Sequence, residues 1–200
     1  MSVAVRDEGR LPTTVEGTRS TAWWGMLWFI AAELALFGTF LASYFYLRFQ
    51  APTWPPTGDE DPNLVAASVM TVILLSSSLP MWWAERGIKR GDVTVLKIGL
   101  ALSAVLGLVF LAFQADEYLT AEISWRTDAY GSLFFFITGF HGLHVLGGLL
   151  MNATTQVRAW RSHFDREHHV GVEVVALYWH FVDAVWVAIV LSLYFSTYWH

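Results

Sequence analysis

Two pairs of ionisable side chains lie inside stretches of the chain that are otherwise apolar. His141 and His144 lie within residues 134–151, and His180 and Asp183 lie in a second apolar run further along the chain. The members of each pair are three residues apart, so on a helix they would share one face. Imidazoles and carboxylates can carry protons, bind metals or bond to one another. At membrane depth such groups are costly and indicate function by default.

Glu33 is a fifth ionisable group in an apolar setting, within residues 22–49. At about 1.5 Å per helical residue, it would lie roughly 16 Å from the start of that segment. The two histidine-containing pairs also fall near the middle of a hydrocarbon core that is about 30 Å thick. We therefore expect all five groups to gather near the mid-plane of a membrane.

Several interpretations of these five groups are open. They could take up protons or line a proton or ion channel, or they could simply join helices through hydrogen bonds. Two facing histidines on different helices could also ligate a haem, as in a membrane cytochrome b. Three intramembrane histidines can supply one such pair, but not the four ligands that two haems usually need.

The composition narrows the class of protein. Of the 200 residues, 55% are hydrophobic and only 14% are charged, and the mean hydropathy is positive, which is typical of a polytopic membrane protein. The chain has no cysteine, which excludes disulfides, zinc–cysteine sites, iron–sulfur clusters and thiolate copper sites. The net charge of −5 gives no indication of nucleic-acid binding.

Five segments are long and apolar enough to form transmembrane helices. We predict an all-α fold, a polytopic membrane helix bundle in one domain (22–200), preceded by a polar tail (1–21) that has no apolar core and is not a signal peptide. Serines at 76–78 beside Pro80 indicate helix packing or a kink. The expected helices cover approximately residues 22–49, 64–83, 93–115, 129–153 and 172–198.

The distribution of basic residues predicts the orientation of the bundle. The tail and the second and fourth loops together hold nine Lys and Arg residues, whereas the first and third loops hold only Arg126. Because cytoplasmic loops are enriched in Lys and Arg, we expect the N-terminus in the cytoplasm and the C-terminus outside. The fourth loop also contains Arg158, His168 and His169, which fit either an ordinary basic loop or a site for anionic lipid headgroups.

Four stretches resemble subunit III of the haem–copper cytochrome c oxidases. The most specific are YGSLFFFITGFHGLHV, which is similar to the family's fourth-helix signature, and HHVGVE followed by YWHFVDAVW, which is similar to its last loop and last helix. The stretch QADEY and the stretch GMLWFIAAELALF, which contains Glu33, also resemble the family. The resemblance covers residues 24–198 and is closest to the five-helix bacterial form, which lacks the first two helices of longer members.

The resemblance implies a non-redox subunit of a bacterial terminal oxidase in the cell membrane, with no catalytic residue and no metal ligand in this chain. Haem and copper are expected in partner subunits. Subunit I would be the main contact, with subunit II and further small subunits in the complex. The chain would bind structural phospholipid through Arg158, His168, His169 and Glu33, and Glu33 would also be the family's membrane carboxyl. A quinol-oxidase subunit III and an accessory subunit of a nitric oxide reductase are the alternatives within the family.

Overall fold

The computed structural model describes residues 19–56, 63–121 and 124–196, which form five long helices and no strand. All five are long and apolar enough to cross a membrane, which confirms the predicted all-α bundle. Most of the expected polar tail and the last residues of the chain lie outside the described ranges. The helices are α1 (Thr21–Gln50), α2 (Leu64–Lys89), α3 (Val93–Thr120), α4 (Ala129–Trp160) and α5 (Val170–Ile189), which continues into a short π-helix, η1 (Val190–Phe195).

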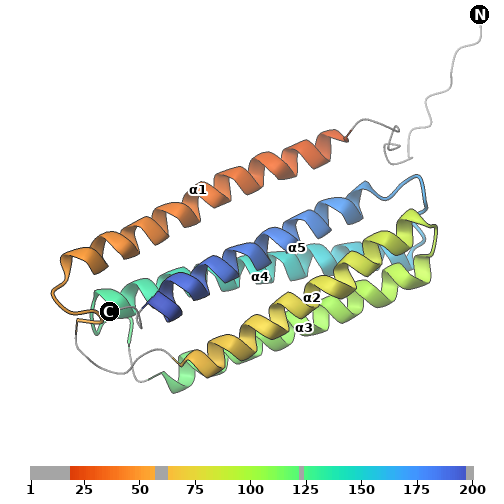
Figure 1. The fold of residues 1–200 in the computed structure, drawn as a ribbon. Helices are drawn as coiled ribbons and strands as arrows, with labels where there is room; N and C mark the ends of the chain where they lie inside the picture. Colours follow the sequence, from red (N-terminus) through yellow and green to blue (C-terminus); the bar gives the residue numbers. More distant parts are fainter. Residues whose placement is uncertain (1–18, 57–62, 122–123, 197–200) are drawn as a thin grey trace, which may run out of the picture.

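Helix α5 is the centre of the bundle. It contacts α1, α2 and α4, and Figure 1 shows it running between α1 and α2 with α4 behind it. Its two tryptophans are fully buried, and both donate their indole N–H groups to hydroxyls of α2. Trp179 bonds to Ser77 at 2.9 Å and Trp186 bonds to Thr71 at 3.0 Å. These bonds fix the register of α5 against α2, because an indole N–H in hydrocarbon has no water to bind.

The α2–α3 hairpin is closed by a turn that the sequence encodes locally. Gly91 has φ +83°, a left-handed conformation that favours glycine. The backbone N–H groups of Gly91 and Asp92 donate to the carbonyls of Ile88 and Gly87, which ends α2. The Asp92 carboxylate then accepts the N–H groups of residues 94 and 95, each at 3.0 Å, and so caps α3.

Helix α1 is attached to the bundle by one narrow seam. Its buried residues are Ile30, Phe37 and Tyr44, which are spaced seven apart and therefore form one line along the helix. This line contacts α5 and α4, and Figure 1 shows α1 along one side of the bundle. Glu33 lies at the flank of the seam, one turn from Ile30, so α1 carries its ionisable group along the edge of its contact with the bundle.

Three helices run further than the sequence predicts, and the first of them, α2, reaches Lys89 instead of ending near residue 83. Helix α4 ends at Trp160, not near residue 153, so Arg158 lies in its last turn and not in a loop. The termination uses Ser162, which adopts φ 56° although it is not glycine, and the N–H of His163 donates to the Arg158 carbonyl at 3.1 Å. Helix α3 reaches Thr120, because polar residues in its last turns find partners on other elements.

The partners of these α3 residues are Tyr194 of η1 and Thr138 of α4. The Tyr194 hydroxyl donates to the Glu117 carboxylate at 3.0 and 3.2 Å. The Gln114 amide donates to the Thr138 carbonyl at 2.6 Å, and Tyr118 contacts the Thr138 hydroxyl at 2.6 Å. Polar residues that resemble a loop in the sequence therefore continue the helix, because tertiary hydrogen bonds satisfy them.

The α2–α3 and α4–α5 connections lie at the same end of the bundle, which also holds the start of α1 (Figure 1). We call it the basic end, defined by residues 85–92 and 158–169. The distribution of basic residues predicts that this end faces the cytoplasm, and that orientation stays a prediction.

We predict that Gly99→Ala destabilises the bundle and that Gly38→Ala does not. A Cβ on Gly99 would lie 2.5 Å from the Pro80 carbonyl oxygen and 2.7 Å from the Ala84 Cβ, so α2 and α3 would have to move apart. We expect a loss of roughly 1–3 kcal/mol in unfolding free energy. Gly38 has nothing within 4 Å of such a Cβ, so alanine there should stabilise the helix by up to roughly 1 kcal/mol.

The measurement is circular dichroism of both variants in mild detergent during titration with SDS. Equal midpoints for the two variants would contradict the close α2–α3 contact.

Candidate functional site

Glu33 and His144 form a hydrogen-bonded pair between α1 and α4. Glu33 Oε2 lies 3.0 Å from His144 Nε2, and the other ring nitrogen, Nδ1, lies 2.9 Å from the Phe140 carbonyl oxygen. A carbonyl oxygen only accepts hydrogen bonds, so Nδ1 carries a hydrogen and donates it. The bond between Nε2 and Oε2 therefore contains one proton, which belongs either to the carboxyl or to the ring. In both cases the pair has no net charge.

The pair is largely enclosed by aromatic side chains. Only 18% of the Glu33 side chain and 11% of the His144 side chain are exposed. The rings of Phe37 and Phe140 each lie 5.1 Å from the His144 ring, centroid to centroid. The Tyr178 hydroxyl donates to the His144 backbone carbonyl at 3.1 Å, which ties this turn of α4 to α5. A neutral pair suits this setting, because an isolated charge in hydrocarbon is costly.

His141 does not join this pair through a hydrogen bond. Its ring is fully buried, and neither ring nitrogen has a hydrogen-bond partner within the described ranges. Three aromatic rings surround it, with centroid distances of 5.1 Å to Trp186, 5.9 Å to Phe110 and 6.4 Å to Phe37. In this structure His141 is therefore a packed aromatic ring at the junction of α1, α3, α4 and α5.

The second polar cluster joins α2 to α5. The Ser78 hydroxyl donates to Asp183 Oδ2 and lies 2.8 Å from His180 Nδ1. Since the hydroxyl hydrogen is used by Asp183, the Ser78 oxygen accepts from His180, and Nδ1 must carry a hydrogen. The donor chain therefore runs from His180 through Ser78 to Asp183. Four of the five predicted groups thus form two clusters, and His141 is separate from both.

Ser78 is a functional candidate that the sequence analysis does not identify. It lies in the run of serines beside Pro80, where packing or a kink is the simpler interpretation. The available signal was depth, since Ser78 and Asp183 both lie well inside long apolar segments. A hydroxyl at the depth of a buried carboxylate is a natural hydrogen-bond donor, but the sequence does not say which helices face each other.

Ion pairs link α2 to α5 at the basic end. Lys89 Nζ lies 2.6 Å from Glu85 Oε1 and 3.0 Å from Glu173 Oε1. His169 Nε2 lies 3.6 Å from the same Glu173 oxygen, and its residue is 93% buried, since only 7% is exposed. His169, predicted to contact lipid, is therefore held inside the protein by Glu173.

Of the three other residues predicted to contact lipid, Arg158 and His168 lie at the surface of the basic end. Arg158 is half-buried, with its guanidinium 5.1 Å from the Phe164 ring centroid and close to Gly171 at the start of α5. His168 is half-buried, and its Nδ1 lies 3.0 Å from the Asp165 carboxylate. Glu33 lies on α1 and bonds to His144, so the expected lipid residues do not form one site.

Asp165 stabilises the turn that carries His168. Desolvation acts to raise the pKa of this carboxyl, but the N–H groups of His168 and Glu167 and the His168 ring outweigh it and hold the pKa below its ordinary value. The carboxylate therefore stays ionised at neutral pH. Its contribution to the turn is present above the ordinary Asp pKa and is lost as the pH falls through the lowered value.

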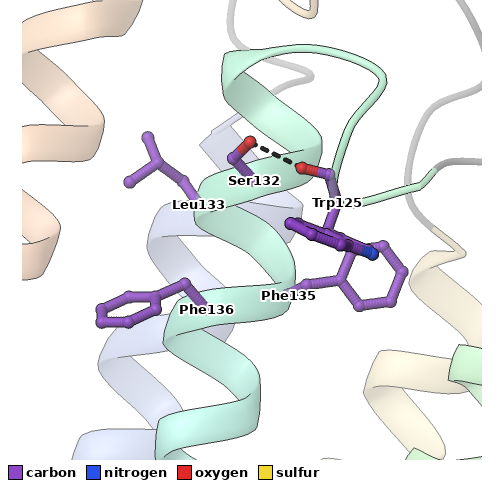
Figure 2. A pocket seen from close by; sticks show the side chains of 5 residues that line it. All are labelled: Trp125, Ser132, Leu133, Phe135 and Phe136. Carbon is purple, nitrogen blue, oxygen red and sulfur yellow. Dashed lines mark hydrogen bonds between the residues drawn. The ribbon is translucent and has the colours of Figure 1, made fainter.

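A shallow hollow lies at the other end of α4 from the basic end. It has a volume of about 490 Å³, and Figure 2 shows the Ser132 side chain beside the Trp125 carbonyl, to which it donates at 2.8 Å. The lining is almost entirely apolar and aromatic and offers no ionisable group for chemistry. The residues around it are Trp125, Ser132, Leu133, Phe135 and Phe136.

No three His, Asp or Glu side chains converge as a metal site within residues 19–56, 63–121 and 124–196. Both nitrogens of His144 and the Nδ1 of His180 are already engaged in hydrogen bonds with protein groups. The expectation that this chain carries no haem or copper stays a prediction.

Comparisons with known proteins identify the family. Residues 9–200 match the family model described as cytochrome c oxidase subunit III. Cytochrome c oxidase subunit 3 of the cyanobacterium Synechocystis is 38% identical over 174 residues, covering 85% of this chain and 73% of that protein. The subunit of Thermostichus vulcanus is 37% identical and covers 86% of each chain. That of the carp Cyprinus carpio is 44% identical over 88% of this chain and 68% of its own length.

The matched range includes all five membrane-spanning helices. The chain belongs to the cytochrome c oxidase subunit III family, whose members are parts of an oxidoreductase complex.

Proposed function

We propose that this chain is a non-redox subunit III of a bacterial aerobic terminal oxidase, which reduces oxygen to water and pumps protons. It packs mainly against subunit I, with subunit II and smaller subunits in the same complex. It lies in the bacterial plasma membrane with its N-terminus in the cytoplasm. The haem and copper centres belong to the partner subunits, and this chain binds phospholipid, supports proton uptake and stabilises subunit I. Family membership supports the assembly.

The proposed role in proton uptake rests on the hydrogen bond between Glu33 and His144. One proton is shared between Oε2 and Nε2 across 3.0 Å. A second proton would give the pair a positive charge, and loss of the shared proton would give it a negative charge. Both charged states are costly in hydrocarbon, so the pair returns to neutrality by passing a proton on or taking one back. This behaviour fits a local proton store better than a permanent ion pair.

Arg158 supports the phospholipid-binding role. A guanidinium can bind two phosphate oxygens at once, and Phe164 and Gly171 hold this one beside the start of α5. His168 lies in the same connection, positioned by Asp165. His169 is buried against Glu173, so within this chain it shapes the connection from inside.

The assembly is tested by purifying the tagged chain from its native membrane in mild detergent and recording an optical spectrum. We expect haem-bearing partners to co-purify with a chain that is itself colourless when separated. A copper-centre band in the spectrum would identify a cytochrome c oxidase. A complex that lacks this band and contains bound quinol would be a quinol oxidase. A chain that purifies alone with a Soret band dependent on His141, His144 or His180 would refute the proposal.

We predict that Glu33→Gln and Glu33→Leu impair the oxidase in the same way. Glutamine keeps a hydrogen bond to His144 Nε2 but cannot exchange a proton, whereas leucine removes both. If proton exchange matters, both variants should start at nearly the wild-type rate of oxygen consumption and then lose activity several-fold faster during turnover. The measurement is oxygen uptake by the purified complex followed until inactivation.

The glutamine variant separates function from structure. If Glu33→Gln behaves as wild type and only Glu33→Leu fails, the pair merely attaches α1, and such a bond is worth about 1 kcal/mol. Leu34→Ala is the matched control, because Leu34 is exposed beside Glu33 and should leave both stability and turnover unchanged.

We predict that Arg158→Gln lowers the amount of phospholipid retained by the purified complex. The change removes the charge that would bind phosphate but keeps a long polar side chain in the last turn of α4. Arg161→Gln is the control, because Arg161 is exposed at the C-cap of the same helix. Native mass spectrometry measures the lipid directly, and equal retention by both variants would contradict an Arg158 site.

A further inference from the structure

The donor chain on α2 and α5 ends at an unused ring nitrogen. His180 Nδ1 donates to Ser78, which donates to Asp183, so His180 Nε2 is left as the outer end of the chain. In the neutral ring Nε2 holds a lone pair and is a hydrogen-bond acceptor. It bonds to no group in the part of the chain that the structure describes, and the His180 side chain is only half-buried, so this acceptor is open to the surface.

The position of His180 makes an open acceptor unfavourable in lipid. It lies ten residues after Val170, where α5 begins, which corresponds to about 15 Å along the helix. That is near the middle of a hydrocarbon core about 30 Å thick. Acyl chains have no hydrogen-bond donor at this depth, and polar groups inside membranes therefore face protein or water.

Two stripes of residues run side by side on this surface. On α5 the half-buried positions Glu173, His180 and Val187 are spaced seven apart. On α2 the half-buried positions Thr71, Ser78 and Glu85 have the same spacing. A seven-residue repeat is the pattern by which one helix packs along another. We call this surface the α2–α5 face, defined by these six residues together with Ala184.

Ala184 makes the face accessible to a third helix. It is exposed, one turn beyond His180, and its side chain is a single methyl group. Small residues at such positions let two helix backbones approach closely in a membrane. The α2–α5 face therefore combines a small contact residue with an acceptor at mid-depth.

We propose that the α2–α5 face receives a transmembrane helix of another oxidase subunit, which places a hydrogen-bond donor at His180 Nε2. A side chain such as Ser, Thr, Asn, Gln, Tyr or Trp supplies that donor. The incoming helix completes a chain that ends at Asp183, a residue with only 4% exposure whose Oδ1 has no partner of its own within the described residues. The inference rests on the proposed function, since it needs a complex with other membrane subunits, and it specifies which face makes the contact.

A photo-crosslinking amino acid at position 184 tests the inference in the intact complex. We expect protein adducts with one partner subunit from position 184. The matched control is the same amino acid at position 108, because Leu108 is 57% exposed on α3, away from the α2–α5 face, and should give lipid adducts only. Lipid adducts alone at position 184 in an intact complex would overturn the inference. So would protein adducts at position 108 but none at position 184.

Substitution of His180 tests the hydrogen bond itself. We expect His180→Leu to raise the fraction of this chain released from the complex by about threefold or more on titration with detergent. His180→Gln should restore most of the wild-type retention, because the amide oxygen can accept from the incoming donor. Native mass spectrometry measures the released fraction. Equal release for all three proteins would exclude a hydrogen bond at Nε2.

The outcomes separate the two proposals. If the chain fails to co-purify with haem-bearing subunits at all, the proposed function and this inference both fail. If it co-purifies while position 184 contacts only lipid, the proposed function stands and the α2–α5 face is not the interface.

Discussion

A polar atom inside a hydrocarbon layer has no water to bind, so the protein itself must provide its partner. This constraint determines how the helices of this bundle meet. The indole N–H groups of α5 bond to hydroxyls of α2, and the Asn152 amide of α4 donates to the Leu100 carbonyl of α3 at 3.2 Å. Apolar side chains fill the space between helices, but lipid is equally apolar and would accept them in many registers. The polar bonds select one register.

The same constraint makes α1 depend on a small number of polar links. A seam of three buried residues is little contact for a helix of 30 residues. The Glu33–His144 bond lies beside that seam and is the polar link between α1 and α4. The second polar link of α1 is near its C-terminal end, where the Tyr44 hydroxyl lies 3.0 Å from the Ser196 hydroxyl. The group to which we assign a proton-handling role therefore also helps to hold its helix in place, so a variant that keeps the hydrogen bond is needed to tell the two roles apart.

Sequence reasoning identifies the helices because long apolar segments have few alternatives in a membrane, but it places some of their ends wrongly. Helix α4 continues seven residues beyond the predicted end at 153. The Thr155 hydroxyl is satisfied within the helix by the Met151 carbonyl, and the helix ends before Ser162, which is not glycine. Polar residues past a membrane segment look like a loop in the sequence, although they can extend the helix beyond the lipid.

The candidate site shows a different limit of the sequence. Spacing along one helix shows that His141 and His144 share a face, but their partners come from other helices. One ring is bonded to Glu33 and the other is packed among aromatic rings, and nothing in their spacing distinguishes these outcomes. Ser78 was not identified for the same reason, since a serine in a helix can donate to a buried carboxylate only when that carboxylate faces it.

The two polar clusters differ in how they are completed, and this difference bears on their roles. In the Glu33–His144 cluster both ring nitrogens have partners within this chain, so the proton it shares stays inside the subunit until a neighbouring group approaches. In the cluster of α2 and α5 the chain of donors stops at His180 Nε2, on the surface. The first arrangement is complete in a single subunit, whereas in our proposal a partner helix completes the second. On that proposal the subunit would hold a proton within itself and would extend a hydrogen-bonded series of groups into the complex.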